Sequence, residues 1–367
     1  MLELADIVGR YGPDYLARYQ DRMLPSHRCA LADIAACRTA QLGGHVYFCP
    51  PCQKRQYEYH SCKNRHCPKC QNQQATRWLE RQRRWLLPTH YFLATFTLPA
   101  GLRPLARSHQ KAVYRCLFQA AAQALQKLAR DPRFVGGQIG MIAVLQTCTR
   151  DLRYHPHLHG LIPGGGITPQ GRWRFSAKNF FLPSQALSPI FQAKFRDALK
   201  KANLFSLAPA SVWKQDWVVD CRPAGPGLSV LKYFAPYIYR VALSNRSLLS
   251  LANGQVRFQY RDGKSGQPQI ATLSATVFLS RFLQHVLPDG FVKVRYYGFL
   301  HPKNRKRFET ILLPLGGNPR PALAGLQPCG EAEQQGSPFS STTPSCPRCG
   351  CPMILLETLL PAKRGPP

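Results

Sequence analysis

The sequence has few acidic residues. Eighteen Asp and Glu stand against 49 Lys and Arg, which gives the 367-residue chain a formal net charge of +31. A compact protein with this imbalance repels itself, so a polyanionic partner is the natural explanation. The phosphate backbone of a nucleic acid is a better candidate for this partner than a membrane surface, because the sequence shows no basic amphipathic anchor. We therefore expect nucleic acid as the partner.

The sequence also lacks a secretory leader and a long membrane-type apolar run. The segment Met1–Asp6 is mixed and acidic, whereas a signal peptide starts with a basic region followed by an apolar one. Residues 85–102 are nearly free of charge, but Pro88, His90 and three threonines suit a buried strand better than a membrane helix. These absences predict a cytoplasmic protein without a membrane partner.

Cysteine is abundant, and seven of the fourteen cysteines lie in the first 75 residues. Without a leader, metal ligation is a better explanation for them than disulfides. Two Cys-x-x-Cys pairs each offer two thiolates across a tight turn, as tetrahedral zinc requires. The predicted ligands of this structural zinc are Cys49, Cys52, Cys67 and Cys70. Four thiolates leave no open position for catalysis.

A second zinc site could form from the remaining ligands of this region, which are Cys37, His45, Cys62 and His66. The spacing does not fix the pairing, and interleaved ligation between the two sites is equally allowed. Near the other end, Cys346-Pro-Arg-Cys349 is half a zinc knuckle, with Cys329 and Cys351 as candidate completions.

Basic side chains occur between these ligands, in the predicted helix of residues 74–86, and again near residue 305. On a metal-stapled module such a run favours phosphate binding over a merely solvated face. The residues that we expect to contact DNA are Lys63, Arg65, Lys69, Arg81, Arg83, Arg84, Arg240, Arg305, Lys306 and Arg307.

The pattern along the chain predicts three regions: a zinc-binding DNA-recognition module (1–75), a main domain (76–315), and a flexible tail with a partial zinc knuckle (316–367), which has the Gly, Pro, Ser, Thr and Gln composition of a linker. In the main domain, strands are expected at 91–98, 140–147, 154–163 and 291–298, with a hairpin at 255–260 and 268–273. Helices are expected at 113–128, 187–203 and 274–287.

Three histidines alternate in the strand predicted at 154–163, within the stretch YHPHLHG. Alternate side chains share one face of a strand, and neighbours on that face lie roughly 6–7 Å apart. Two neighbouring imidazoles can therefore converge on one metal ion, whereas His155 and His159 are about 13 Å apart. We predict that His157 and His159 form the pair, with His155 as a further candidate.

Two tyrosines, Tyr233 and Tyr237, are four residues apart in the stretch SVLKYFAPYIYR. On a helix both would lie on one face, about one turn apart. Together with the histidines and the basic surface they suggest phosphodiester chemistry. A metal ion would polarise the phosphodiester, and a tyrosine hydroxyl would attack phosphorus to give a 5′-phosphotyrosine link that a later 3′-hydroxyl can reverse.

These motifs also resemble a known family. His157-Leu158-His159 is similar to the His-hydrophobic-His motif of the HUH endonucleases. The stretches Arg153–Gly166 and Cys37–Cys70, and the tyrosines followed by Ser244-Asn245-Arg246, resemble rolling-circle insertion-sequence transposases with an N-terminal zinc-binding domain. The resemblance covers roughly residues 25–312, with several motifs in the same order.

The resemblance implies an α+β fold, with an HUH-type antiparallel central sheet flanked by helices and preceded by a small zinc-ribbon-like domain. It implies rolling-circle transposition of single-stranded DNA with terminal hairpins, in the cytoplasm of a bacterium and close to the nucleoid. His157 and His159 would bind Mg²⁺ or Mn²⁺, and Tyr233 and Tyr237 would be the nucleophiles. A third polar ligand is usual in these enzymes, and the candidates are Gln146, Asp151 and His155.

Three alternatives stay open from the sequence. A replication initiator or relaxase of the HUH type would make the same cut at a different site. A non-catalytic zinc-ribbon DNA-binding protein would use the histidines for structural metal. A metal-dependent phosphodiesterase would use water and form no covalent adduct.

Overall fold

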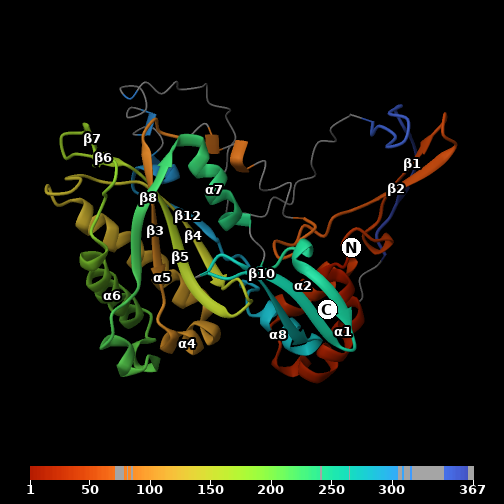
Figure 1. Cartoon of the computed structure of the whole chain (residues 1–367), viewed down its shortest axis with the longest axis horizontal. Coiled ribbons are helices and arrows are strands. Elements are labelled where there is room, and N and C mark those ends of the chain that lie inside the picture. Colours follow the sequence, from red (N-terminus) through yellow and green to blue (C-terminus); the bar gives the residue numbers. More distant parts are fainter. Residues whose placement is uncertain are drawn as a thin grey trace. The chain divides into compact units, whose positions relative to one another are not determined.

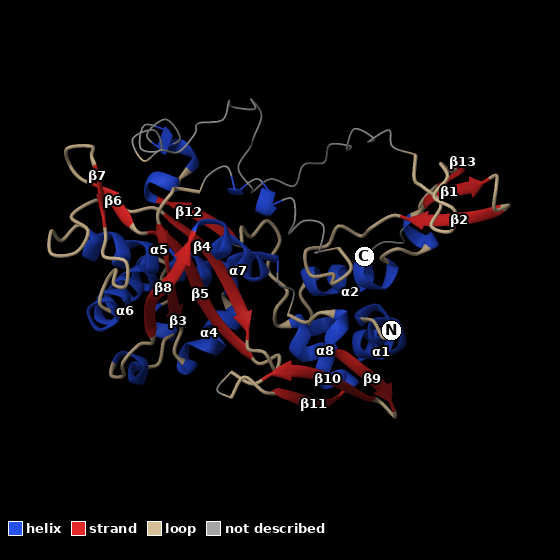
Figure 2. Ribbon diagram, turned by 45° about the horizontal axis from the view of Figure 1, so that its top comes forward, coloured by secondary structure: helices blue, strands red, loops and turns tan. Residues whose placement is uncertain are grey.

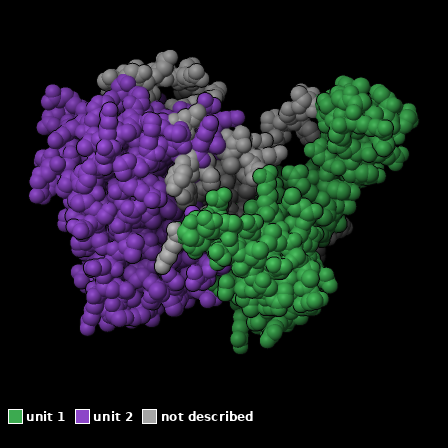
Figure 3. All heavy atoms as spheres, in the orientation of Figure 1, with its two compact units in different colours: residues 1–73, 241–286, 332–367 green, residues 74–240, 287–331 purple. Residues whose placement is uncertain are grey.

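The computed structural model describes residues 1–70, 78–80, 82–83, 86–239, 242–263, 265–304, 308–309, 315 and 343–362. The chain forms two compact units (Figure 3). We call residues 1–73, 241–286 and 332–367 the zinc unit, and residues 74–240 and 287–331 the sheet unit. This division departs from the predicted one, since residues 241–286 and the tail belong with the N-terminal residues.

The sheet unit is built on a five-stranded sheet with the order β12-β4-β5-β3-β8. All four neighbouring pairs are antiparallel, so the predicted antiparallel sheet is confirmed. Its strands are β3 (His90–Thr97), β4 (Met141–Cys148), β5 (Tyr154–Pro163), β8 (Val219–Pro226) and β12 (Val294–Tyr297). The edge strand β8 was not predicted, because its sequence VDCRPAGP lacks β-branched alternation and contains two prolines.

The two faces of this sheet are covered by different helices (Figure 1). Leu158 and Ile162 of β5 belong to a large buried core that also contains residues of α5 (Gln110–Ala129) and α6 (Ser184–Lys201). Leu161, on the opposite face, packs in a second cluster with residues of α7 (Gly227–Tyr239). The sheet is therefore flanked by helices on both sides, as the sequence predicted.

The sheet unit also contains α4 (Arg103–Ser108) and the small hairpin of β6 (Gly165–Ile167) and β7 (Trp173–Phe175). None of the helices in the described part of the chain is both long and apolar enough to cross a membrane.

Among its described residues, the zinc unit contains the helices α1 (Leu4–Tyr19), α2 (Pro25–Ala36) and α8 (Ala275–Leu283) and two small sheets (Figure 2). The first sheet has the order β13-β1-β2, with β1 (Gly44–Cys49), β2 (Lys54–Tyr59) and β13 (Ile354–Leu359). The tail was predicted to be flexible, but its residues 343–362 contain β13, which pairs with the edge of β1. Sequence composition could not reveal this pairing, because the partner strand lies about 300 residues earlier in the chain.

The second sheet has the order β11-β10-β9, with β9 (Leu248–Ala252), β10 (Gln255–Arg261) and β11 (Pro268–Ser274). The predicted hairpin of β10 and β11 is confirmed. Helix α8 (Ala275–Leu283) follows, and the Val277 N–H donates a 3.4 Å hydrogen bond to the Ser274 hydroxyl at its N-terminus. Because α8 packs against α1, this segment joins the N-terminal residues.

Candidate functional site

The histidines lie in the middle of the five-stranded sheet. His157 of β5 is paired with Gln146 of β4 and Thr97 of β3, and His159 with Val144 and Thr95. Because side chains alternate along a strand, both imidazoles share a face with Leu161, which is the face covered by α7. Their ring centroids are 4.8 Å apart. The predicted pair therefore converges.

Hydrogen bonds orient both rings. Nδ1 of His157 donates to the backbone oxygen of His155 at 2.7 Å, so the proton is on Nδ1 and the lone pair is on Nε2. Nδ1 of His159 lies 3.2 Å from the hydroxyl oxygen of Thr95. Burial and the neighbouring His157 lower the pKa of His159 to about 3. His159 is thus neutral at neutral pH, which is the form that binds a metal ion.

His155, the further candidate ligand, has a different environment. A guanidinium nitrogen of Arg103 donates to its Nδ1 at 2.8 Å. Burial, and then the charges of His157 and Arg103, lower the pKa of His155 to about 4. A cation in contact with the ring opposes a second positive charge on it, so His155 is a poor ligand for a divalent ion.

The other two candidates for a third ligand also have defined positions. The carboxylate of Asp151 forms an ion pair with Arg153 at 2.6 Å and accepts a hydrogen bond from the Thr149 hydroxyl. Gln146 is 7% exposed and lies beside His157 on the neighbouring strand, on the same face of the sheet. Of the candidates, Gln146 is therefore the one whose position suits a ligand beside His157.

Helix α7 carries the two tyrosines. Its residues Val230, Leu231, Phe234 and Ile238 are buried in the cluster that contains Leu161. The backbones of Tyr233 and Tyr237 belong to α7, one turn apart, and their side chains lie outside the described residues. The structure thus brings the helix of the predicted nucleophiles onto the face of the predicted metal ligands.

Four cysteines of the N-terminal segment form one metal-ligand group. The Sγ atoms of Cys37, Cys62, Cys67 and Cys70 lie within 4.8 Å of one another. Cys70 Sγ is 3.5 Å from that of Cys37 and 3.6 Å from that of Cys62. Tetrahedral zinc with bonds of about 2.3 Å sets its sulfurs about 3.8 Å apart. This N-terminal cysteine group therefore has the size of a closed structural zinc site.

A second group joins both ends of the chain. The Sγ atoms of Cys49, Cys52, Cys346 and Cys349 also lie within 4.8 Å of one another, with 3.5 Å between Cys49 and Cys349 and 4.0 Å between Cys52 and Cys346. The Cys351 backbone N–H and the neighbouring thiols lower the pKa of Cys349 to about 6. This favours the thiolate, the form that ligates zinc. We call these residues the split cysteine group.

The single site predicted from Cys49, Cys52, Cys67 and Cys70 is therefore not formed, and the N-terminal cysteine group has the interleaved ligation that the spacing also allowed. Cys49 and Cys52 do not share a site with Cys67 and Cys70, and neither His45 nor His66 belongs to either group. Cys49 and Cys52 lie at the turn of the β1–β2 hairpin, whereas Cys62, Cys67 and Cys70 follow its other end. A six-residue strand spans about 17–20 Å, so one ion cannot bind both pairs. The tail pair had the same Cys-x-x-Cys spacing as the other two and was the signal for the missing ligands.

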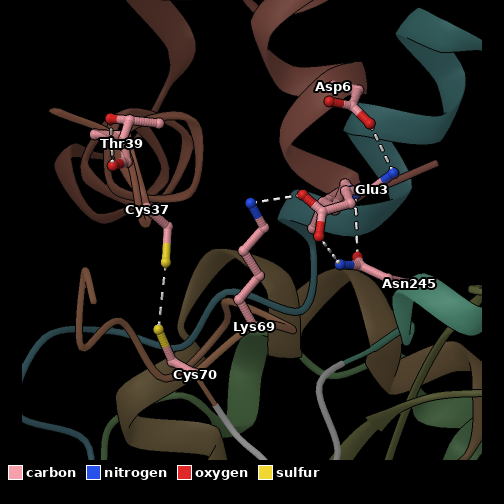
Figure 4. A network of polar contacts seen from close by, with 9 residues as sticks. Glu3, Asp6, Cys37, Thr39, Lys69, Cys70 and Asn245 are labelled. Atoms are coloured by element: carbon pink, nitrogen blue, oxygen red, sulfur yellow. Dashed lines mark hydrogen bonds and ion pairs between the residues drawn. The ribbon is translucent and has the colours of Figure 1, made fainter. Parts of the chain in front are cut away.

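A network of polar contacts ties the N-terminal cysteine group to the rest of the zinc unit (Figure 4). Lys69, next to Cys70, forms a 2.5 Å ion pair with Glu3. The Asn245 side-chain amide donates to Glu3 and accepts from the Leu4 N–H. Lys69, which we predicted to contact DNA, is thus partly buried and forms an ion pair inside the unit. This ion pair accounts for a lysine beside the zinc ligands without a DNA phosphate as its partner.

The other predicted DNA contacts stay predictions. Lys63, Arg65 and Arg83 are exposed. The remaining ones lie outside the described residues: Arg81, Arg84, Arg240, Arg305, Lys306 and Arg307.

Comparisons with known proteins agree with this arrangement. Residues 7–98 match the family model described as "Transposase zinc-binding domain", and residues 140–307 match the one described as "Putative transposase". The second range contains the histidine strand and α7. The first contains six of the eight cysteines in the two groups. No solved structure shows significant similarity.

Two curated relatives are similar over most of their length. The chain is 38% identical to "Putative transposase y4qJ" of Sinorhizobium fredii over 388 aligned positions, which cover 100% of the chain and 97% of that protein. It is 28% identical to "Transposase for insertion sequence element IS801" of Pseudomonas savastanoi pv. phaseolicola, over 87% of the chain and 80% of that protein. The chain therefore belongs to the IS801/IS91 family of transposases.

Proposed function

We propose that this transposase cuts and rejoins single-stranded DNA through 5′-phosphotyrosine links, with Tyr233 and Tyr237 as its nucleophiles. The observation that carries the proposal is the position of α7. The helix packs on the face of the sheet from which His157 and His159 project. A tyrosine nucleophile and a metal-ligand pair have to meet at one phosphodiester, and the packing of the tyrosine helix on the face that carries the two imidazoles supports this.

The histidine pair fits a divalent ion, Mg²⁺ or Mn²⁺. Both rings are oriented by hydrogen bonds through Nδ1, and a ring held in this way presents Nε2 to the ion. We assign Gln146 as the third ligand, because it lies next to His157 and offers a carbonyl oxygen. When bound, the ion would polarise the scissile phosphate and offset charge on its oxygens.

The protein's part in the reaction is to supply and hold the nucleophile. The phenolic oxygen of one tyrosine attacks phosphorus in line, the bond from phosphorus to the 3′-oxygen breaks, and that oxygen leaves as a 3′-hydroxyl after taking up a proton. The phosphotyrosine ester retains the energy of the broken bond. A second 3′-hydroxyl can therefore attack it, release the tyrosine and join the strands without ATP. Two tyrosines allow two strands to be held in succession.

We extend the proposal to the substrate. The chain's net charge of +31 suits a polyanion, and rolling-circle transposition would present the ends of the element as single strands with hairpins. In this proposal the zinc unit recognises the ends, and the sheet unit cuts and rejoins them.

The test is a covalent-adduct assay. Purified protein is mixed with 5′- and 3′-labelled single-stranded oligonucleotides from the element's ends and Mg²⁺, then run on a denaturing gel. We expect a shifted band that carries the DNA downstream of the cut and is lost in the Tyr233→Phe, Tyr237→Phe double variant. Tyr239→Phe, in the same helix, serves as the matched control and should keep the band.

Two outcomes would contradict the proposal. An adduct that survives in the double variant would remove the assigned nucleophiles. Cleavage without any adduct would indicate that water attacks the phosphate directly, as in an ordinary metal-dependent phosphodiesterase.

A further inference from the structure

The sheet formed by β9, β10 and β11 has one buried face and one exposed face. Val256 and Phe258 of β10 are fully buried, and the Phe258 ring lies 5.9 Å from that of Phe278 in α8. The intervening residues Arg257 and Gln259 are exposed, as is Arg261. The central strand therefore carries a row of three long side chains, each able to donate hydrogen bonds, on the face away from its helix.

The neighbours of this row are small, polar or apolar. Arg257 is paired with Thr272 of β11 and Ser250 of β9, and Gln259 with Ile270, which is 53% exposed. None of the residues in these three strands is acidic. A face that only meets water usually mixes both charge signs. This face instead combines positive charge with amide and hydroxyl groups, which suits an anionic partner with polar edges.

The dimensions of the face match the major groove of duplex DNA. Three strands spaced 4.7–4.9 Å apart make a surface about 10 Å wide, and the major groove is about 12 Å wide. Along β10, side chains on one face recur about every 6.8 Å, close to two base-pair steps of about 3.4 Å. Sheets and β-ribbons are known to enter the groove in this way.

The residue types on the face match those that read base edges. Arginine forms two parallel hydrogen bonds with guanine, and glutamine does the same with adenine. Arginine binds phosphates as well as bases, but phosphate contacts alone would not require the uncharged glutamine between the two arginines. We propose that the outer face of β9–β11 lies in the major groove of duplex DNA and reads bases through Arg257, Gln259 and Arg261.

The inference rests on the proposed function in that it supplies the recognition step for the DNA that the enzyme processes. Duplex segments would be the stems of the terminal hairpins or the double-stranded flanks of the element. Recognition by this face is separate from strand cutting, so the two can be tested apart.

The experiment measures duplex binding by the full-length protein without Mg²⁺, so that failure of the phosphotyrosine chemistry does not affect the readout. A preferred sequence is selected from a random-duplex library, and its affinity is compared with that of a scrambled duplex by fluorescence anisotropy. We expect Gln259→Ala and Arg257→Lys each to reduce this preference about tenfold or more. Arg257→Lys keeps the charge and loses the fork, so the salt dependence of binding should stay the same.

Arg10→Ala is the matched control, because it removes an exposed arginine from α1 of the same unit. It should leave the sequence preference intact, and circular dichroism should show that all three variants are folded. If Arg10→Ala lost as much of the preference for the selected duplex as the β10 variants, the loss would come from the removal of positive charge in general. That result would overturn the inference. So would an unchanged preference in Gln259→Ala and Arg257→Lys, or a wild-type protein that selects no duplex sequence.

Discussion

The two sheets that carry the metal-ligand candidates are stabilised in opposite ways. In the sheet unit, β5 is buried along nearly its whole length, between α5 and α6 on one face and α7 on the other. In the zinc unit, β13 is almost entirely exposed, and the buried cluster beside it consists of Cys49, Cys346 and Met353. The first sheet has a hydrophobic core of its own. The second sheet has only this small cluster of two cysteines and one methionine in place of a hydrophobic core.

Under the proposed function, this difference separates two uses of metal. A sheet with three buried residues beside it cannot balance the conformational entropy of its strands by apolar burial alone, so zinc has to supply the folding energy. The five-stranded sheet has a buried apolar cluster on each face and needs no such help. Loss of a cysteine ligand should therefore unfold the β13-β1-β2 sheet, whereas loss of a histidine should only inactivate the five-stranded sheet's site.

The largest effect is expected in the split cysteine group. Cys346→Ser should lower the zinc content from two ions per chain to one and melt the β13-β1-β2 sheet, because structural zinc contributes on the order of 10 kcal/mol of folding free energy. Metal analysis and hydrogen exchange of residues 44–59 and 354–359 would measure both effects. Cys351→Ser, in the same tail but outside the group, should change neither. Retention of two zinc ions in Cys346→Ser would show that the tail pair is not a ligand pair.

The next effect concerns His157→Ala. Cleavage of single-stranded DNA should fall by at least about a thousandfold, since a polarising metal contributes several kcal/mol to such reactions. Zinc content and the melting temperature of the sheet unit should stay close to those of the wild type. His109→Ala, an exposed histidine at the start of α5, should cleave normally. If His157→Ala instead unfolds the sheet unit, the contrast between the two metal uses fails.

A smaller effect is expected from Thr95→Val, which keeps the shape of the side chain and removes its hydrogen bond to His159 Nδ1. Groups that orient a ligand typically change metal affinity by about 10–100-fold. The Mg²⁺ concentration for half-maximal cleavage should rise by that factor, and saturating Mg²⁺ should restore most of the rate. A loss of rate that no Mg²⁺ concentration restores would place Thr95 in a role other than orienting the ring.

Local patterns predicted the histidine strand and several of the other strands. The period-two alternation of YHPHLHG placed His157 and His159 on one face of a strand, and alternation depends only on residues next to each other. The same reasoning gave β3, β4 and the hairpin of β10 and β11. Thr95 was missed because it becomes a partner of His159 only through the pairing of β3 with β5.

Long-range pairing explains the failures. The ligands of the split cysteine group come together because β13 pairs with β1. The Cys-x-x-Cys spacing at Cys346 marks a ligand pair, but it does not say which other pair completes the site. The placement of residues 241–286 in the zinc unit likewise depends on α8 meeting α1. Strand β8 has a poor β-sequence and is held by its neighbour β3 rather than by its own propensity.

The split cysteine group also sets an order of events during synthesis. All four ligands of the N-terminal cysteine group have been translated by residue 70, but Cys49 has to wait for Cys349, 300 residues later. At about 5–20 residues per second this delay is roughly 15–60 s. The whole sheet unit leaves the ribosome in that interval. Capture of the second zinc ion thus marks a nascent transposase whose sheet unit has already been synthesised.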